Sequence, residues 1–405
     1  MLKILQLNTT VNTGSTGRIA EEIGKTMISK GWESYIAYGR TARESHSHII
    51  RIGNDFDIFV HGLSTRFLDN HCLSSTRATH AFIKKLEKIK PDLIHIHNIH
   101  GYYVNMKVLF DYLRTTNIPI VWTLHDCWPM TGHCAHFDFI NCNKWKTECH
   151  SCPNLRAYPS TFFIDRSRRN FNFKKNSITS CNNITFVTPS VWLQKIVKLS
   201  FLKNYRTLVI NNGIDLSVFR PIKKDGIREK YGISEKDILI LGVASVWSKH
   251  KGLDDFIKLS SLLDNDEKIM LVGLNSKQSE GLPSNIIAVS RTENIEELSA
   301  LYSSADVFVN PTWVDNFPTT NIEALACGTP VVTYNTGGSP EALTPDTGFV
   351  VNKGDVTGIY RVIKEIIRKG KFSFVENCRQ HAVANYNKDE RFVDYYNLYM
   401  SILNS

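Results

Sequence analysis

Ten short apolar runs alternate with helix-like segments along almost the whole chain, and they form two sets of five. Alternating strands and helices predict parallel sheets that are covered by helices on both faces. Two sets predict two doubly wound domains, as expected for 405 residues, which exceed one ordinary core. The predicted strands span residues 3–8, 34–39, 92–97, 118–124, 184–189, 237–245, 267–273, 285–290, 306–311 and 329–334.

The domain boundaries are predicted from the turn and helix signals. Residues 1–205 form an N-terminal Rossmann-like domain, and residues 223–385 form a C-terminal one. Segment 206–222 joins them, because a turn-forming Asn-Gly pair there precedes a proline. Apolar side chains at helical spacing make 386–405 a helix, which we expect to return to the N-terminal domain. Ligands bind beyond the carboxyl ends of parallel strands, so two facing domains would form one cleft.

The formal charge of +9 is unevenly distributed. Residues 1–205 hold 26 Lys+Arg against 14 Asp+Glu, and the remainder holds 22 against 25. A basic first half favours contact with an anionic membrane surface or nucleic acid, with general solubility as the plain alternative. Segment 165–175, DRSRRNFNFKK, would suit an anionic headgroup layer. Without a membrane span or a signal-peptide pattern, we expect a cytoplasmic protein, peripheral at the inner face of the membrane.

The stretch WVDNFPTTNIEALACGTPVV (313–332) places Asp315 and Glu323 eight positions apart around a polar loop. The loop follows a predicted strand, and a short helix follows the loop. The N-terminus of that helix offers unpaired N–H groups that favour a phosphate. A phosphate linked to sugars on both sides would explain both acids. The structural alternative is a capping box, Thr320-x-x-Glu323, in which Glu323 only bonds to the backbone.

This stretch resembles the signature of the retaining glycosyltransferases of family GT4, which have the GT-B fold. Their pattern is an acid, seven residues, a Glu, then Ala-x-Ala-x-Gly-x-Pro-Val, and Asp315 stands where the family usually has Glu. The resemblance implies that Asp315 contacts the donor sugar and that Glu323 contacts the ribose. It also implies that backbone amides of the loop hold the distal phosphate of the donor. The donor-loop residues are then Asn316, Phe317, Pro318, Thr319 and Thr320.

Other segments extend the resemblance over nearly the whole chain. VINNGIDLSVFRP (209–221) resembles the interdomain segment of the family, and ELSALYSSADVFVNPT (297–312) resembles the helix and strand before the acid loop. Lys251 matches a lysine that neutralises the diphosphate, although by itself it would be a solvated surface lysine. The resemblance also places contacts to the base near Arg291 and Thr292.

One part of the family's phosphate clamp is missing. The arginine usually found five or six residues before the clamp lysine is replaced by Ser245 or Val246. We expect Lys249 or His250 to supply this charge.

In the first domain, Gly14 and Gly17 of TGSTGR (13–18) follow the first strand and permit close approach of the backbone to a ligand. The resemblance implies that this loop faces the donor diphosphate or the acceptor. Its glycine spacing differs from G-x-G-x-x-G, which disfavours a dinucleotide dehydrogenase. His125 ends another predicted strand. The resemblance implies that it approaches the transferred sugar, whereas an isolated His-Asp pair is more often structural.

A second strand end carries the candidates for the acceptor pocket. HNIHGYYVN (97–105) follows the strand 92–97. Its polar side chains could bind acceptor hydroxyls, or they could be buried and satisfied within the protein. The candidates are His97, His100, Tyr102 and Asn105.

Five of the nine cysteines lie within residues 127–152, in a predicted insertion of about 127–160. Cys149 and Cys152 have a metal-ligand spacing, and Cys134 and Cys142 would complete a tetrahedral structural zinc site. The alternative is that reduced thiols pack as small apolar side chains.

The expected function is transfer of a sugar from a nucleotide diphosphate sugar to a saccharide or lipid-linked saccharide in cell-surface polysaccharide biosynthesis. The resemblance implies retention of the anomeric configuration, and we expect neither a catalytic metal nor a nucleic-acid partner. Two alternatives stay open. One is a nucleotide-sugar epimerase or phosphorylase on a similar fold. The other is a zinc-containing nucleic-acid-binding protein, which would bind in a salt-sensitive manner.

Overall fold

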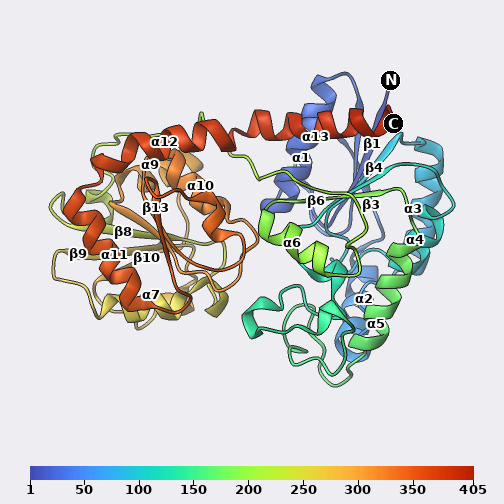
Figure 1. Ribbon diagram of the computed structural model, residues 1–405, viewed down its shortest axis with the longest axis horizontal. Helices are drawn as coiled ribbons and strands as arrows, with labels where there is room; N and C mark the ends of the chain where they lie inside the picture. Colours follow the sequence, from blue (N-terminus) through green and yellow to red (C-terminus); the bar gives the residue numbers. More distant parts are fainter. The chain divides into compact units, whose positions relative to one another are not determined.

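The computed structural model describes residues 1–405, and the chain forms two compact units. Unit 1 contains Met1–Ile210 and Phe392–Ser405, and unit 2 contains Asn211–Arg391. Each unit has one parallel sheet with helices packed around it (Figure 1). All ten predicted strands are present, so the predicted class of two doubly wound α/β domains is confirmed.

The sheet of unit 1 has seven parallel strands in the order β3-β2-β1-β4-β5-β6-β7. The strands are β1 (Lys3–Asn8), β2 (Glu33–Tyr38), β3 (His48–Arg51), β4 (Leu93–Ile96), β5 (Ile120–Thr123), β6 (Ile184–Thr188) and β7 (Thr207–Val209). The helices are α1 (Gly14–Ser29), α2 (Asp55–Leu68), α3 (Thr76–Ile89), α4 (Met106–Leu113), α5 (Ser167–Thr179) and α6 (Val191–Leu199).

The sheet of unit 2 has six parallel strands in the order β10-β9-β8-β11-β12-β13. The strands are β8 (Ile238–Val243), β9 (Glu267–Val272), β10 (Ile286–Val289), β11 (Val307–Asn310), β12 (Val331–Tyr334) and β13 (Gly348–Val351). The helices are α7 (Leu253–Ser260), α8 (Ser276–Ser279), α9 (Ile295–Ser304), α10 (Thr319–Ala326), α11 (Val356–Lys369) and α12 (Phe372–Tyr386).

Both sheets have a topological switch point, where the strand order reverses. In unit 1 this point lies between β1 and β4, and in unit 2 it lies between β8 and β11. The loops that leave two neighbouring parallel strands at their carboxyl ends diverge there, which makes the switch point the usual ligand site of such sheets. In unit 2 these are the loops 244–252 and 311–318.

The last helix, α13 (Lys388–Leu403), completes the core of unit 1. Phe392, Tyr395 and Tyr399 are buried in one cluster with Ile23 and Trp32, and α13 lies beside α1 in Figure 1. Burial of an aromatic side chain of this size contributes about 1.5–3 kcal/mol. The predicted return of the C-terminal helix to the first domain is therefore present in the fold.

Segment 165–175, which we expected to suit an anionic headgroup layer, exposes only some of its side chains. Phe171 and Lys174 are buried on α5. The Lys174 ammonium donates to the Trp128 carbonyl at 2.7 Å and lies 3.7 Å from the centroid of the Trp128 ring. Burial lowers the pKa of Lys174 to about 7. None of the helices combines the length and the apolar character that crossing a membrane requires.

Candidate active site

Lys251 and Asp315 meet at the switch point of unit 2. Lys251 ends the short 3-10 helix Lys249–Lys251 after β8, and Asp315 lies in the loop after β11. The Lys251 ammonium donates to Asp315 Oδ2 at 2.6 Å, and both side chains are partly exposed. The two loops also share backbone contacts, because Trp313 N donates to the His250 carbonyl at 2.8 Å. A cation and an acid are thus held together at the strand ends.

The Asp315 loop is fixed by close backbone contacts. Asp315 Oδ1 accepts from the Phe317 N–H at 3.2 Å, and the Asp315 carbonyl accepts from the Gly338 N–H at 3.1 Å. Gly337 has a φ of +55°, and a Cβ at this position would lie 1.8 Å from the Asp315 carbonyl oxygen. Only glycine fits there, because both the backbone conformation and the space exclude a side chain.

Helix α10 begins at Thr319, directly after this loop, and Pro318 is its N-cap. No side chain caps this end, so the first N–H groups of α10 have no acceptor within the helix. Together with the dipole of the helix they favour an anion. The buried side chains Asn316 and Phe317 precede the helix, and Thr319 and Thr320 form its start.

Glu323 lies one turn into α10 and accepts a hydrogen bond from the Tyr302 hydroxyl at 2.9 Å. Burial, followed by the charge of Glu323, raises the pKa of Tyr302 well above its usual value, so the hydroxyl stays a donor. The capping-box alternative is wrong, because Thr320 lies inside the helix rather than at its N-cap. Tyr302 therefore orients the Glu323 carboxylate.

A buried network of polar side chains fixes the start of α10. Asn310 at the end of β11 donates to the Asn321 side chain at 2.7 Å. Asn321 in turn donates to the Ser339 carbonyl at 3.1 Å, and the hydroxyls of Ser339 and Thr333 are 2.9 Å apart. Such satisfied buried networks fix the position of the element that they hold. The amide end of α10 is thereby tied to β11 and β12.

The remaining donor candidates of unit 2 lie at strand ends on the surface. Ser245 and Val246, which stand where the family arginine is expected, are exposed after β8. Lys249 is exposed nearby. Arg291 is exposed and Thr292 is half-buried between β10 and α9. Supply of the missing charge by Lys249 or His250 stays a prediction.

In unit 1, hydrogen bonds fix the tautomer of His125. Gln6 donates through its amide nitrogen to the Ala20 carbonyl at 2.8 Å, so its oxygen accepts from His97 Nε2–H at 3.0 Å. Neutral His97 then accepts at Nδ1 from His125 Nε2–H, at 3.0 Å. Burial lowers the pKa of His125 to about 4 and that of His97 well below its usual value. His125 is thus neutral, with its lone pair on Nδ1.

His100 Nε2 lies 2.8 Å from Asp126 Oδ2, and His100 Nδ1 lies 3.1 Å from the Tyr158 hydroxyl. Burial acts to raise the pKa of Asp126, but the charge and hydrogen bond of His100 lower it to about 2. Tyr102, with a φ of +67°, packs edge-on against the Tyr158 ring at 6.1 Å. The structure therefore brings the His97 and His100 candidates together with the His125-Asp126 pair.

Asn105 has the structural role that the sequence left open. Its side-chain oxygen caps α4 by accepting from the Val108 N–H at 3.1 Å. Its amide nitrogen donates to the Leu73 carbonyl at 2.6 Å and to the Thr76 hydroxyl at 3.1 Å. Both amide hydrogens are used within the protein, so the side chain has no donor left over for an acceptor sugar in this conformation.

The two glycines after β1 lie within a helix rather than in a loop. Helix α1 begins at Gly14 and includes Gly17. Gly14 has a φ of +66° and open space around its Cβ position. Gly17 lies against the chain itself, because a Cβ there would be 2.8 Å from Thr10 Oγ1. The close approach at Gly17 is thus to the protein's own loop.

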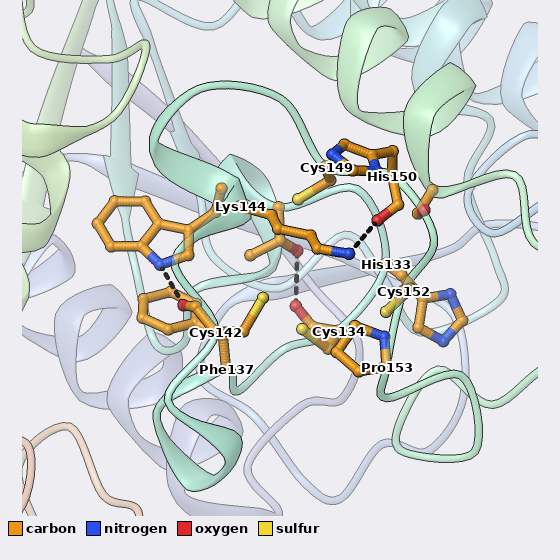
Figure 2. A pocket seen from close by; sticks show the side chains of 12 residues that line it. His133, Cys134, Phe137, Cys142, Lys144, Cys149, His150, Cys152 and Pro153 are labelled. Carbon is orange, nitrogen blue, oxygen red and sulfur yellow. Dashed lines mark hydrogen bonds between the residues drawn. The ribbon is translucent and has the colours of Figure 1, made fainter.

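The cysteine-rich segment surrounds a small cavity (Figure 2). It contains only short 3-10 helices, at Trp128–Met130, Asp138–Ile140 and Lys144–Lys146, and its cavity has a volume of about 20 Å³. The thiols of Cys134 and Cys152 are hydrogen-bonded to each other, which raises the pKa of the first and lowers that of the second. The lining includes all four predicted ligands, Cys134, Cys142, Cys149 and Cys152.

The cavity is not arranged as a finished metal site. No group of three or more His, Cys, Asp and Glu side chains in the chain has the geometry to hold a metal ion. Zinc binding by the four cysteines therefore stays a prediction, and the alternative of packed thiols is equally consistent with this geometry.

Comparison with known proteins places this geometry in a family. Residues 16–218 match the profile described as Glycosyltransferase Family 4, and residues 223–385 match that of the glycosyl transferases group 1. The chain belongs to glycosyltransferase family 4. The predicted GT4 resemblance is confirmed, and the sequence is 23% identical to WcaC, a putative colanic acid biosynthesis glycosyl transferase of Escherichia coli (strain K12), over 99% of this chain and 100% of WcaC.

Solved structures show the same fold at low sequence identity. The sucrose-phosphate synthase of Thermosynechococcus elongatus is 17% identical, with a TM-score of 0.74 and complete coverage of both chains. HepE of Anabaena, solved in complex with UDP and glucose, is 16% identical with a TM-score of 0.70 and covers 99% of this chain and 100% of its own. Membership of family 4 makes the protein a glycosyltransferase, which decides against the epimerase and nucleic-acid-binding alternatives.

The sequence analysis assigned no role to three residues that shape the site. Tyr302 orients Glu323, Gln6 fixes the tautomers of His97 and His125, and Gly337 makes room for the Asp315 loop. Gly337 belongs to a Gly-Gly pair after β12, which was a usable turn signal. The other two act through contacts between distant parts of the chain.

Proposed function

We propose that this family 4 glycosyltransferase transfers a sugar, with retention of configuration, from a nucleotide diphosphate sugar to a saccharide or lipid-linked saccharide acceptor. The observation that carries the proposal is the Lys251–Asp315 pair beside the uncapped start of α10. A lysine and a helix N-terminus bind a diphosphate, and a carboxylate accepts from sugar hydroxyls. HepE, solved with UDP-glucose, supports the class of donor, and the name of WcaC supports a role in polysaccharide biosynthesis. We place this role in the cytoplasm, at the membrane.

In the transfer reaction, negative charge develops on the departing diphosphate of the donor. The bond between the sugar and the diphosphate breaks, and the acceptor oxygen forms the new glycosidic bond. The acceptor proton passes to the departing phosphate, so no protein nucleophile is needed. Lys251 and the α10 amides stabilise the growing negative charge of the diphosphate, which is the largest electrostatic contribution in such sites. The sugar carries oxocarbenium character in the transition state, as in glycoside hydrolysis.

Lys251 and Asp315 form an ion pair with each other before the donor binds. Each neutralises the other until the diphosphate draws Lys251 away, and Asp315 then accepts from hydroxyls of the donor sugar. Glu323, oriented by Tyr302, accepts from the ribose. In unit 1 we assign the neutral His125 to the transferred sugar, and His97, His100 and Tyr102 to the acceptor region.

A panel of nucleotide diphosphate sugars tests the donor. A ligand at 100 times its dissociation constant stabilises the fold by about 2.7 kcal/mol, which a thermal shift detects. With the donor found, Lys251→Ala and Glu323→Ala should abolish acceptor-dependent transfer while the protein stays folded. The control is Lys236→Ala, an exposed lysine before β8 at the opposite end of the strand. Undiminished transfer in both variants, or no shift with any nucleotide sugar, would refute the proposal.

A further inference from the structure

Helix α2 packs on unit 1 with its polar side and presents its apolar side to the surroundings. Its two buried side chains, His61 and Thr65, are polar. His61 bonds to the Ser75 hydroxyl at 2.9 Å, and Thr65 donates to the His61 carbonyl within the helix. Five of its apolar side chains recur at i, i+3, i+4, i+7 and i+11 and are exposed, whereas Ile58 is half-buried. They are Phe56, Phe59, Val60, Leu63 and Phe67.

The loop before α5 extends this surface. Phe162 and Phe163 are exposed, the latter at 81%, and the Phe162 ring meets the Phe67 ring edge-on at 5.5 Å. The backbone holds the loop in place, because the Phe162 N–H donates to the Arg66 carbonyl at 2.8 Å. We call these two phenylalanines and the five apolar residues of α2 the aromatic face of unit 1.

An exposed apolar surface of this kind marks an interaction site. Each phenylalanine brings about 150–250 Å² of side-chain surface, so the aromatic face presents several hundred Å² to its surroundings. The His61 ring anchors the polar side of α2 to unit 1, because its Nδ1 bonds to the Ser75 hydroxyl at 2.9 Å and its Nε2 accepts from the Cys72 N–H at 3.0 Å. These contacts leave the apolar side chains of α2 facing outward.

Arginines of α2 and of the start of α5 lie beside the aromatic face. The Arg66 guanidinium lies 5.9 Å from the Phe162 ring. Arg166 and Arg169, at the start of α5, both donate to the Asn70 side chain just beyond α2, at 2.9 and 2.7 Å. Residues 151–205, which include the loop and α5, hold nine Lys+Arg and one acid. Phenylalanines within an arginine rim match a bilayer whose headgroups are anionic.

We propose that the aromatic face docks unit 1 on an anionic lipid bilayer, with the phenylalanines in the interfacial region and the arginines at the headgroups. The proposal extends the proposed function, since a lipid-linked acceptor is presented at a membrane. It keeps the arginines of the predicted contact segment 165–175 and adds the phenylalanines of α2 and of the loop before α5. A second copy of the chain fits less well, because Asp55 is paired with Arg51 and Asp57 accepts from the Asn54 N–H. These acids are not left over for the arginines of another copy.

The test is co-sedimentation of the full chain with vesicles of phosphatidylcholine, with and without phosphatidylglycerol. The double variant Phe59→Ser/Phe163→Ser should lower the partition coefficient on anionic vesicles about tenfold for each phenylalanine. Arg66→Gln should lower it about fivefold on anionic vesicles and leave neutral ones unchanged. The control is Phe372→Ser, since Phe372 is 95% exposed in unit 2, and it should bind as the native chain does.

Each outcome of these measurements either supports or overturns the docking proposal. Binding that the double variant loses and the control keeps supports the proposal. No vesicle binding by the native chain, or binding that the double variant retains, overturns it. So does a dimer in sedimentation velocity without vesicles that the same double variant dissociates, because the aromatic face would then be a self-interface. Transfer to a water-soluble acceptor should be equal in all variants, so failure of docking leaves the proposed function standing.

Discussion

Replacing Gly337 by alanine should move the Asp315 loop without changing any side chain that we assign to substrate binding. The new Cβ would start 1.8 Å from the Asp315 carbonyl oxygen and must be about 1.2 Å farther away to reach an allowed 3.0 Å. The left-handed φ of +55° adds about 1–2 kcal/mol for a residue with a side chain, and the overpacking adds about 1–3 kcal/mol. We expect a total destabilisation of roughly 2–5 kcal/mol.

The effect on transfer should be larger than the effect on folding. A displacement of about 1 Å in a positioned group lowers the rate about 100-fold. Steady-state transfer kinetics would measure this rate, and thermal unfolding would measure the stability, with a midpoint shift of about 2–4 °C per kcal/mol for a domain of this size.

Gly281→Ala is the matched control for this experiment. Gly281 has a φ of +73° but nothing within 4 Å of its Cβ position, so it isolates the conformational cost. Its transfer rate should stay close to that of the native protein. If Gly337→Ala remains folded and transfers as fast as Gly281→Ala, the position of the Asp315 loop does not set the rate and the reasoning is refuted.

Two further predictions concern unit 1. Burial lowers the pKa of five of its histidines, to about 3 for His61 and about 4 for His125. These histidines are therefore neutral in the folded protein, whereas in the unfolded chain they take up protons below pH 6.5. Their contribution to stability is complete above pH 6.5 and is lost as the pH falls toward 4; a denaturation midpoint of unit 1 that stays constant over this window contradicts the burial argument. Metal analysis of protein purified without chelator should give about one zinc per chain, and a zinc-free protein whose four cysteines are all labelled in the native state would show that they are plain thiols.

The sequence predicted the central strands of both sheets but missed β3, β7 and β13. All three lie at sheet edges, as the strand orders show. An edge strand is paired on one side only and is short, so it needs no continuous apolar run. β3, for example, has three exposed residues out of four. The central strands are buried on both faces and are therefore predominantly apolar.

For the site, the sequence located the strand ends but not the contacts across them. Lys251 and Asp315 were each assigned to donor binding, yet their pairing depends on β8 and β11 being neighbours, which only the strand order establishes. Periodicity likewise identifies the two faces of a helix and leaves open which face is covered. The outward apolar side of α2 and the buried Phe171 of α5 are the two cases in which this mattered.

The position of α13 sets the order in which the molecule is finished during synthesis. Residues Phe392–Ser405 belong to unit 1, so its hydrophobic cluster around Trp32 stays incomplete until they are translated. The ribosome therefore completes every residue of unit 2 before it has made these residues of unit 1. A nonsense mutation at codon 392 would leave unit 2 whole and remove part of the interior of unit 1.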